Sequence, residues 1–190
     1  KLSKQVIADA PALKAYVDGR LRYGVDKRLD SQLFSGNGTA PNMEGMTKTG
    51  NFTAFTPTTG DSDIDSISRA KYAIMAADYE PNVVLMNPAN WGTIERLKDS
   101  NNNYIVGDPF GAIVPRMWGL LVVVSNAVTA NKLFVMDSNI AFELWNREGT
   151  VIEMTDSDGT DFQKNLVTVR AERRSALASY VAAATRYGDI

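Results

Sequence analysis

The sequence contains neither cysteine nor histidine among its 190 residues. Without cysteine there can be no disulfide, no thiolate nucleophile and no zinc ribbon. Without histidine there can be no Ser-His triad, and most transition-metal sites are excluded. An enzyme built from this chain would depend on carboxylate pairs, lysine, tyrosine or a cofactor. The sequence therefore predicts a protein that is not an enzyme, with no metal and no cofactor.

The chain also lacks a strong charge of either sign and any long apolar run. Its 20 Lys/Arg and 22 Asp/Glu give a formal net charge of -2. Dedicated nucleic-acid-binding domains are usually basic, so this balance argues against one, although it leaves room for a locally basic face. The longest strongly apolar run, residues 120–124, is the length of a strand. Spanning a membrane takes about 20 apolar residues, so no membrane partner is predicted.

Apolar residues recurring at steps of three and four predict a helix over residues 11–34, about 36 Å long. Asp9 is placed to cap this helix, and Pro11 suits its first turn. The helix should end at residues 35–38, Ser-Gly-Asn-Gly, where a turn-rich segment begins. Its apolar face should comprise Leu13, Tyr16, Val17, Leu21, Gly24, Val25, Leu29 and Leu33.

Two acidic segments look like the first half of a calcium loop. In residues 61–79, however, Ser66 replaces the required glycine and Tyr72 stands where the closing glutamate belongs. We interpret this segment as a helix with Asp61, Asp63 and Asp65 near its positive end. Its buried face should comprise Ile64, Ile67, the stem of Lys71, Ile74 and Met75.

The second acidic segment contains Asp156, Asp158 and Asp161. Val167 occupies the position of the closing carboxylate, so this segment predicts a turn.

Four further segments predict strands and a short helix. Residues 82–100 should form a strand that leads into a helix capped by Asn87, with Trp91, Ile94 and Leu97 facing inward. The β-branched run within residues 116–128 predicts a strand buried on both faces, and residues 131–137 predict another. Alternation over residues 140–156 predicts a hairpin that turns at Arg147-Glu148-Gly149.

The end of the chain predicts one long strand. Val167, Val169, Ala171 and Leu177 would share one face and Arg170, Glu172 and Arg174 the other. Alternating charges on one side of a strand are typical of a solvated or interface face. The predicted interface residues are Arg170, Glu172, Arg173 and Arg174.

Four segments in order resemble one known family. They are "DAPALKAYVDGRLRYGVDKRLDSQLFSGNGTAPNMEGM", "VVLMNPANWGTIERLKDSNNNYIVGDP", "MWGLLVVVSNAV" and "KNLVTVRAERRSALA". The chain resembles the tailed-bacteriophage major capsid proteins of the Hong Kong 97 type, and the resemblance covers essentially all 190 residues.

The resemblance implies an α+β fold of the Hong Kong 97 type with two domains. A peripheral domain, residues 1–49 and 140–178, would hold a long spine helix and a long-stranded sheet. An axial domain, residues 50–139 and 179–190, would hold a central sheet with flanking helices. Members also carry an N-terminal arm and a long hairpin, the E-loop, which this chain is expected to lack. Without them we expect weak assembly, as monomers or small rings.

The implied function is that of a structural subunit of an icosahedral phage or prophage capsid. Such subunits assemble into pentamers and hexamers around double-stranded DNA, which they contact non-specifically. Portal and scaffold proteins are further implied partners, and the implied location is the virion, after assembly in the host cytoplasm. One alternative is an encapsulin-like nanocompartment shell. Another is a carboxylate-dependent hydrolase using residues such as Glu44, Asp61 or Asp156.

The resemblance also marks two positions of a cross-link known in the family. Asn165 falls at an asparagine that forms an isopeptide bond with a lysine of a neighbour's E-loop, and Glu172 falls at the assisting glutamate. The lysine is expected to lie before residue 1, outside this chain. Seven strand residues span roughly 23 Å, so the three groups would have to come from three subunits. The alternative is that Asn165 satisfies backbone groups and that Glu172 pairs with a nearby arginine.

Overall fold

The computed structural model describes residues 1–3, 5, 11–106 and 115–190. Within these residues the chain combines helices with two β-sheets, which confirms the predicted α+β class. It divides into two compact units. Unit 1 comprises residues 1–32 and 144–176, and unit 2 comprises residues 33–143 and 177–190.

The division between the units falls at a different place from the domain boundaries given above. Residues 33–49 group with unit 2, whereas the expected peripheral domain included them. The reason is that Phe34 and Met46 belong to a hydrophobic cluster of unit 2. Backbone hydrogen bonds from Met46 N–H to the Leu33 carbonyl and from Thr47 N–H to the Phe34 carbonyl tie the loop to the same place.

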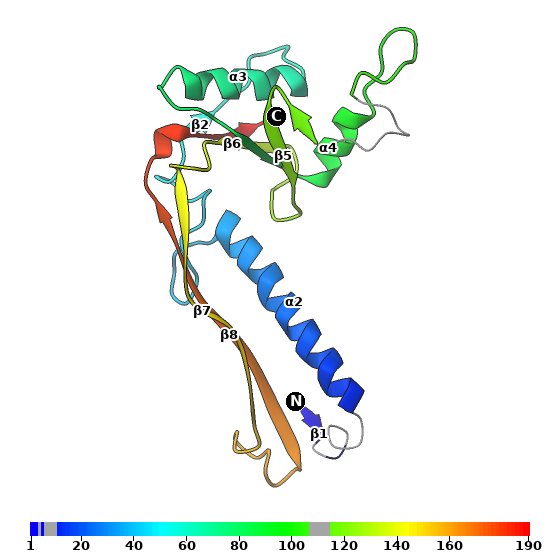
Figure 1. The fold of residues 1–190 in the computed structure, drawn as a ribbon, viewed down its shortest axis with the longest axis vertical. Helices are drawn as coiled ribbons and strands as arrows, with labels where there is room; N and C mark the ends of the chain where they lie inside the picture. Colours follow the sequence, from blue (N-terminus) through cyan, green and yellow to red (C-terminus); the bar gives the residue numbers. More distant parts are fainter. Residues whose placement is uncertain (4, 6–10, 107–114) are drawn as a thin grey trace. The chain divides into compact units, whose positions relative to one another are not determined.

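Unit 1 consists of most of a long helix and a three-stranded sheet (Figure 1). The helix, α2 (Pro11–Ser35), confirms the predicted one, while the cap assigned to Asp9 lies outside the described residues. The sheet has the order β1-β8-β7, with β1 at Leu2–Ser3, β7 at Phe142–Thr155 and β8 at Leu166–Ser179.

The apolar face of α2 is only partly as predicted. Tyr16 is 66% exposed and Gly24 is also exposed, so the prediction was wrong for these two residues. A helix that packs against a single thin sheet buries only a narrow stripe. The half-buried stripe comprises Leu13, Val17, Leu21, Val25 and Leu29.

The long hairpin of β7 and β8 turns later in the chain than predicted. Residues 147–149 lie inside the 14-residue strand β7, and the turn lies at residues 156–165. The turn expected for the second acidic segment is thereby confirmed, and the turn at Arg147-Glu148-Gly149 was wrong. The predicted long last strand is confirmed as β8, with the two faces expected for it.

Unit 2 is built on a six-stranded mixed sheet with the order β2-β9-β6-β3-β5-β4. Its strands β3 and β5 are parallel, with Val84 beside Val122, whereas β6 runs antiparallel to β3 and β9. The strands are β2 (Ala54–Phe55), β3 (Val83–Met86), β4 (Arg116–Met117), β5 (Leu120–Val124), β6 (Lys132–Met136) and β9 (Thr185–Asp189). A 3-10 turn, η1 (Ala182–Ala184), precedes β9.

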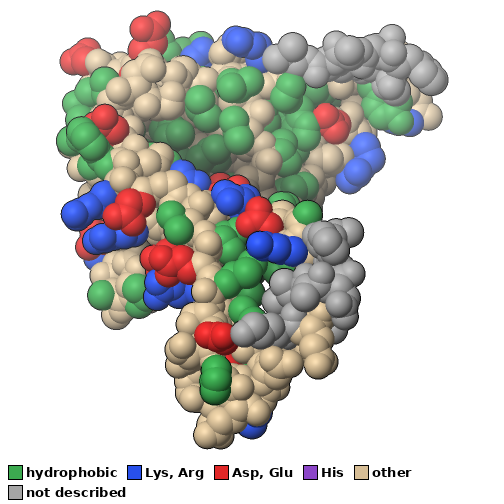
Figure 2. Space-filling model, turned by 60° about the horizontal axis from the view of Figure 1, so that its bottom comes forward, with side chains coloured by type: hydrophobic (Ala, Val, Ile, Leu, Met, Phe, Trp, Pro, Cys, Tyr) green, Lys and Arg blue, Asp and Glu red, His purple; other side chains and the backbone are tan. Residues whose placement is uncertain are grey.

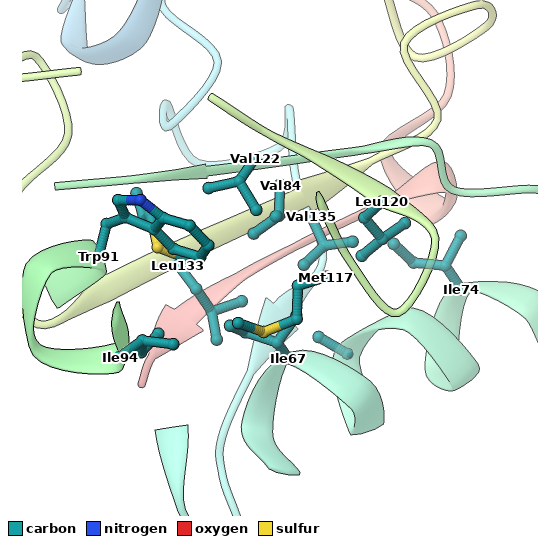
Figure 3. Close-up of a cluster of buried hydrophobic side chains, with 12 residues drawn as sticks. Ile67, Ile74, Val84, Trp91, Ile94, Met117, Leu120, Val122, Leu133 and Val135 are labelled. Carbon is teal, nitrogen blue, oxygen red and sulfur yellow. The ribbon is translucent and has the colours of Figure 1, made fainter. Parts of the chain in front are cut away.

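Two helices contribute to the main core of unit 2 (Figure 3). Helix α3 (Asp63–Met75) supplies Ile67 and Ile74, and helix α4 (Pro88–Glu95) supplies Trp91 and Ile94. Because side chains alternate along a strand, Val84 and Met86 of β3 pack in this core. Leu85 points to the other face of the sheet and packs in the cluster that contains Phe34. Both helices and strands β3 and β6 confirm the predictions.

Helix α3 begins with a capping box. The Ser62 hydroxyl accepts a hydrogen bond from Asp65 N–H, and the Asp65 carboxylate accepts one from Ser62 N–H. The acidic first turn is therefore confirmed, with local roles for its carboxylates. Met75, at the end of the helix, is 44% exposed, so its predicted burial was wrong.

Strand β5 is buried on one face only, contrary to the prediction. Leu120 and Val122 lie in the main core, whereas Leu121, Val123 and Val124 are exposed. A continuous β-branched run is thus no guarantee that helices cover both faces.

No helix among the described residues is both long enough and apolar enough to cross a membrane.

Candidate functional site

The turn between β7 and β8 is organised around Asp161, whose side chain is almost fully buried. Its carboxylate accepts a hydrogen bond from Lys1 Nζ at 2.7 Å and another from the Thr168 hydroxyl at 2.5 Å. The Asp158 carboxylate contacts the same two side chains: its Oδ2 is 3.3 Å from Lys1 Nζ and 3.1 Å from Thr168 Oγ1. The cluster links the residue before β1, the turn and the start of β8.

The charges of this cluster support one another. The hydrogen bond from Lys1 lowers the pKa of Asp161 below the usual carboxyl value, and the bond from Thr168 lowers it further. Conversely, the hydrogen bond to Asp161 raises the pKa of Lys1. Asp161 is therefore ionised at neutral pH and holds the turn closed.

Asn165 lies at the end of this turn and is exposed. Its backbone has φ of +57°, a left-handed conformation that asparagine adopts more readily than most residues. The Asp161 carbonyl accepts hydrogen bonds from Lys164 N–H and Leu166 N–H, one on each side of Asn165. The position of Asn165 relative to β8 is thus fixed by its neighbours.

Three charged residues on the exposed side of β8 pair with one another or with two glutamates of β7, and we call this set the charged face: Glu148, Glu153, Arg170, Glu172 and Arg174. Arg170 Nη2 lies 2.5 Å from the Glu153 carboxylate, and Arg170 Nε lies 3.5 Å from that of Glu172. Arg174 is 3.5 Å from Glu148. All five side chains are substantially exposed, so water screens these pairs and each contributes little to folding.

Arg173 differs from the other three predicted interface residues. Its side chain is only 23% exposed and lies on the opposite face of β8. Its guanidinium donates hydrogen bonds to Asp26 Oδ1 at 3.1 Å and to Asn146 Oδ1 at 2.9 Å. Ser175 completes the network through Asn146. Within unit 1, Arg173 therefore joins α2 to the hairpin.

Asn165 and Glu172 are not brought together within one chain. Asn165 precedes β8, and Glu172 lies in its middle, so about 23 Å of extended strand separates them. Glu172 is instead beside Arg170 of its own chain. Any chemistry that uses both positions needs groups from more than one copy.

The acidic residues considered for calcium or hydrolysis have local partners. Glu44 forms an ion pair with Lys48, and Asp61 lies 2.6 Å from Arg69. Across the residues that the structure describes, no three acidic side chains converge as they would around a metal ion.

Sequence reasoning missed the part played by Asp161 and Lys1. Asp161 was noticed only as part of a calcium-like spacing. Its partner Lys1 is 160 positions away, and no local pattern connects the two.

Comparison with known proteins identifies the class. The phage capsid family matches residues 1–190, and the chain belongs to that family. It is 36% identical over 181 residues to the major capsid protein of Enterobacteria phage HK97, covering 94% of this chain. The chain spans 46% of that relative's length, about half of it.

Solved structures share the fold at lower identity. The capsid of an empty GTA particle superposes with a TM-score of 0.74 at 18% identity, over all of this chain and 70% of that one. A solved structure from Mycobacterium phage Ogopogo superposes with a TM-score of 0.72 at 15% identity, over 99% of this chain and 72% of that one. The resemblance and the fold class predicted from the sequence are confirmed.

Proposed function

We propose that this chain is part of a major capsid protein, a structural subunit that assembles into pentamers and hexamers around double-stranded DNA in a phage or prophage virion. The observation that carries the proposal is the family match along the whole chain, together with 36% identity to a protein named as a major capsid protein. Unit 1 would supply the peripheral domain and unit 2 the axial domain.

The charged face supports a role in packing between copies. It is exposed and made of charges of both signs that already pair within the hairpin. Because these side chains are pre-ordered, a neighbouring copy could contact them at a reduced cost in conformational entropy. Arg170, Glu172 and Arg174 are the proposed contacts, and Arg173 would act by holding the hairpin to α2.

Expression of the full-length protein tests this function. Sucrose-gradient sedimentation should reveal rapidly sedimenting particles and smaller capsomers. Charge reversal at Arg170→Glu with Arg174→Glu should shift material from particles to capsomers or monomers. Reversal at Arg96→Glu with Lys98→Glu, two exposed residues of unit 2, is a control that removes the same charge. Monomers alone from the unmodified protein would contradict the proposal.

The cross-link positions are a second, separable part of the proposal. Glu172 of one copy would accept a proton from a lysine of another copy, and the neutral amine would attack the Asn165 side-chain carbonyl of a third. The amide nitrogen would leave as ammonia and an isopeptide bond would remain. Ladders on denaturing gels of assembled particles, lost in Asn165→Asp and Glu172→Gln, are expected. Monomer bands alone would leave Glu172 only the ion pair with Arg170.

Neither alternative function gains support from the site. Of the carboxylates considered for a hydrolase, Glu44 and Asp61 are each paired with a basic side chain, and Asp156 accepts a hydrogen bond from the Ser157 hydroxyl. An encapsulin-like shell shares the implied fold. Terminase and portal genes beside the coding gene would favour the phage capsid, and cargo-enzyme genes would favour the encapsulin.

A further inference from the structure

Two exposed tyrosines and two cations line one face of α2. Tyr16, Arg20, Tyr23 and Lys27 follow one another at steps of four, three and four residues, which places them on one side of a helix. We call this set the α2 stripe. Tyr16 is 66% exposed and Tyr23 57%, although a soluble helix normally turns its aromatic residues inward.

The cations of the α2 stripe are not neutralised by the acids of the same helix. Asp18 accepts a hydrogen bond from Arg22 at 3.0 Å, and Asp26 accepts one from Arg173 at 3.1 Å. No ion pair joins Arg20 or Lys27 to an acidic residue that the structure describes. Asp30 lies one turn beyond Lys27 without pairing to it. The stripe is therefore locally basic in a chain whose net charge is -2.

The basic character extends to the whole of unit 1. Its sequence holds twelve Lys/Arg and ten Asp/Glu, a formal charge of +2. Unit 2 holds eight and twelve, a formal charge of -4. On the face that Figure 2 displays, acidic and basic side chains are interspersed, with no large area of one sign. The α2 stripe differs from this mixed surface, because its two cations form no ion pair with an acidic residue that the structure describes.

The side chains of the stripe are also pre-arranged. The Arg20 guanidinium lies 5.4 Å from the centre of the Tyr23 ring, within the range of a cation–π contact. This contact limits the rotamers of both side chains and leaves the guanidinium donors and the Tyr23 hydroxyl available. Arginine, lysine and tyrosine are among the side chains that hydrogen-bond to phosphate oxygens.

We propose that the α2 stripe binds the phosphate backbone of double-stranded DNA without sequence preference. The inference rests on the proposed function, which supplies DNA as the enclosed partner, and deepens it by assigning a contact site. The stripe is about 16 Å long, a length of duplex that carries about ten phosphates. Two cations neutralise only a small share of that charge, so each copy binds weakly.

The test is fluorescence anisotropy of a labelled 30-base-pair duplex titrated with the chain of residues 1–190. Arg20→Ala with Lys27→Ala should weaken binding about tenfold at low salt and reduce the slope of log K against log salt by about 1.8, because two counterion-releasing contacts are lost. Both residues are exposed and alanine favours helices, so the fold should persist, which circular dichroism checks.

The matched control is Arg96→Ala with Lys98→Ala. It removes one arginine and one lysine, and Lys98 also lies over a tyrosine ring, 4.7 Å from the centre of Tyr104. This variant should keep the affinity and the slope. A separate variant, Tyr16→Ser with Tyr23→Ser, should weaken binding without changing the slope, because tyrosine carries no charge.

Three results would overturn the inference. They are unmodified protein that fails to bind the duplex, equal losses in the stripe and control variants, and an unchanged slope in Arg20→Ala with Lys27→Ala. Sedimentation of the full-length protein separates this inference from the proposed function. The stripe variant should still form particles, and failure to do so would show that the stripe contacts another copy instead. Absence of particles from the unmodified protein would contradict the proposed function alone.

Discussion

The lack of a side chain at Gly188 allows strands β2 and β9 of unit 2 to approach each other closely. Gly188 lies in β9 opposite Phe55 of β2, and a Cβ atom at this position would be 1.8 Å from the Phe55 carbonyl oxygen. Gly188→Ala should therefore force the strands apart and lower the free energy of unfolding by about 2 kcal/mol, measured by urea denaturation.

Gly149→Ala is the control for this substitution, because nothing lies within 4 Å of the added Cβ. Its effect should stay within about 0.5 kcal/mol. Equal effects of the two substitutions would show that β2 does not pack against β9 as described.

Asp161 should make stability depend on pH. Because its pKa is lowered in the folded chain, the ionised carboxylate stabilises the fold above the ordinary carboxyl pKa of about 3.9, and this stabilisation is lost as pH falls through the lower folded value. Asp161→Asn should lower the unfolding free energy at pH 7, and its difference from the unmodified chain should shrink below about pH 4.

Asp158→Asn is the comparison for this prediction, since Asp158 is about half exposed and makes longer contacts with the same two donors. It should lower stability by less. A pH-independent difference for Asp161→Asn, measured by chemical denaturation between pH 3 and 7, would contradict the role given to the carboxylate.

Single residues were predictable when their partners were close in the sequence. The cap at Asn87 follows from its own position before Pro88, and its side chain accepts a hydrogen bond from Ala89 N–H. The clash at Gly188 and the ion pair of Asp161 involve partners more than 130 positions away. No periodicity or local motif carries that information.

At the scale of elements, the hairpin shows how a local turn signal can mislead. Arg147-Glu148-Gly149 resembles a turn, yet Gly149 has no positive φ and lies within β7. The turn forms instead at residues 156–165, where Gly159 and Asn165 both have positive φ. Side-chain contacts on both faces of the hairpin hold β7 extended through the predicted turn.

The packing of α2 on the hairpin depends on Arg173. A double-mutant cycle of Arg173→Ala and Asp26→Ala should give a coupling energy of about 0.5–1 kcal/mol, because the Arg173 side chain is only 23% exposed and is also bound to Asn146.

The same cycle on Arg174 and Glu148, whose ion pair is exposed, should give less than about 0.5 kcal/mol. Couplings are measured by urea unfolding. A larger coupling on the charged face than at Arg173 would contradict the assignment of Arg173 to the packing of α2.

Strand and helix types were more predictable than their burial. The sequence placed α2, α3, α4, β3, β6 and β8 correctly because each has a strong periodicity or a cap. Whether Tyr16 and Leu121 are exposed depends on how many other elements pack against their helix or strand. Periodicity alone does not contain this information.

At the scale of the whole molecule, the family resemblance was based on four segments in order along the chain. The family match over residues 1–190 confirms it. Without the resemblance, composition and the periodicity of the segments gave only an α+β protein that lacks histidine and cysteine. The expected domain boundary at residue 49 differs from the structural division because Phe34 and Met46 pack in unit 2. Assembly is a property of several copies, so it remains the central proposal.

The most direct measurement is an electron cryomicroscopy reconstruction of particles formed by the full-length protein. We predict a closed icosahedral shell of pentamers and hexamers, with unit 2 around their axes and Arg170, Glu172 and Arg174 within contact distance of a neighbouring copy. Purified protein that stays monomeric under all assembly conditions, or shells in which the charged face touches no neighbour, would contradict it.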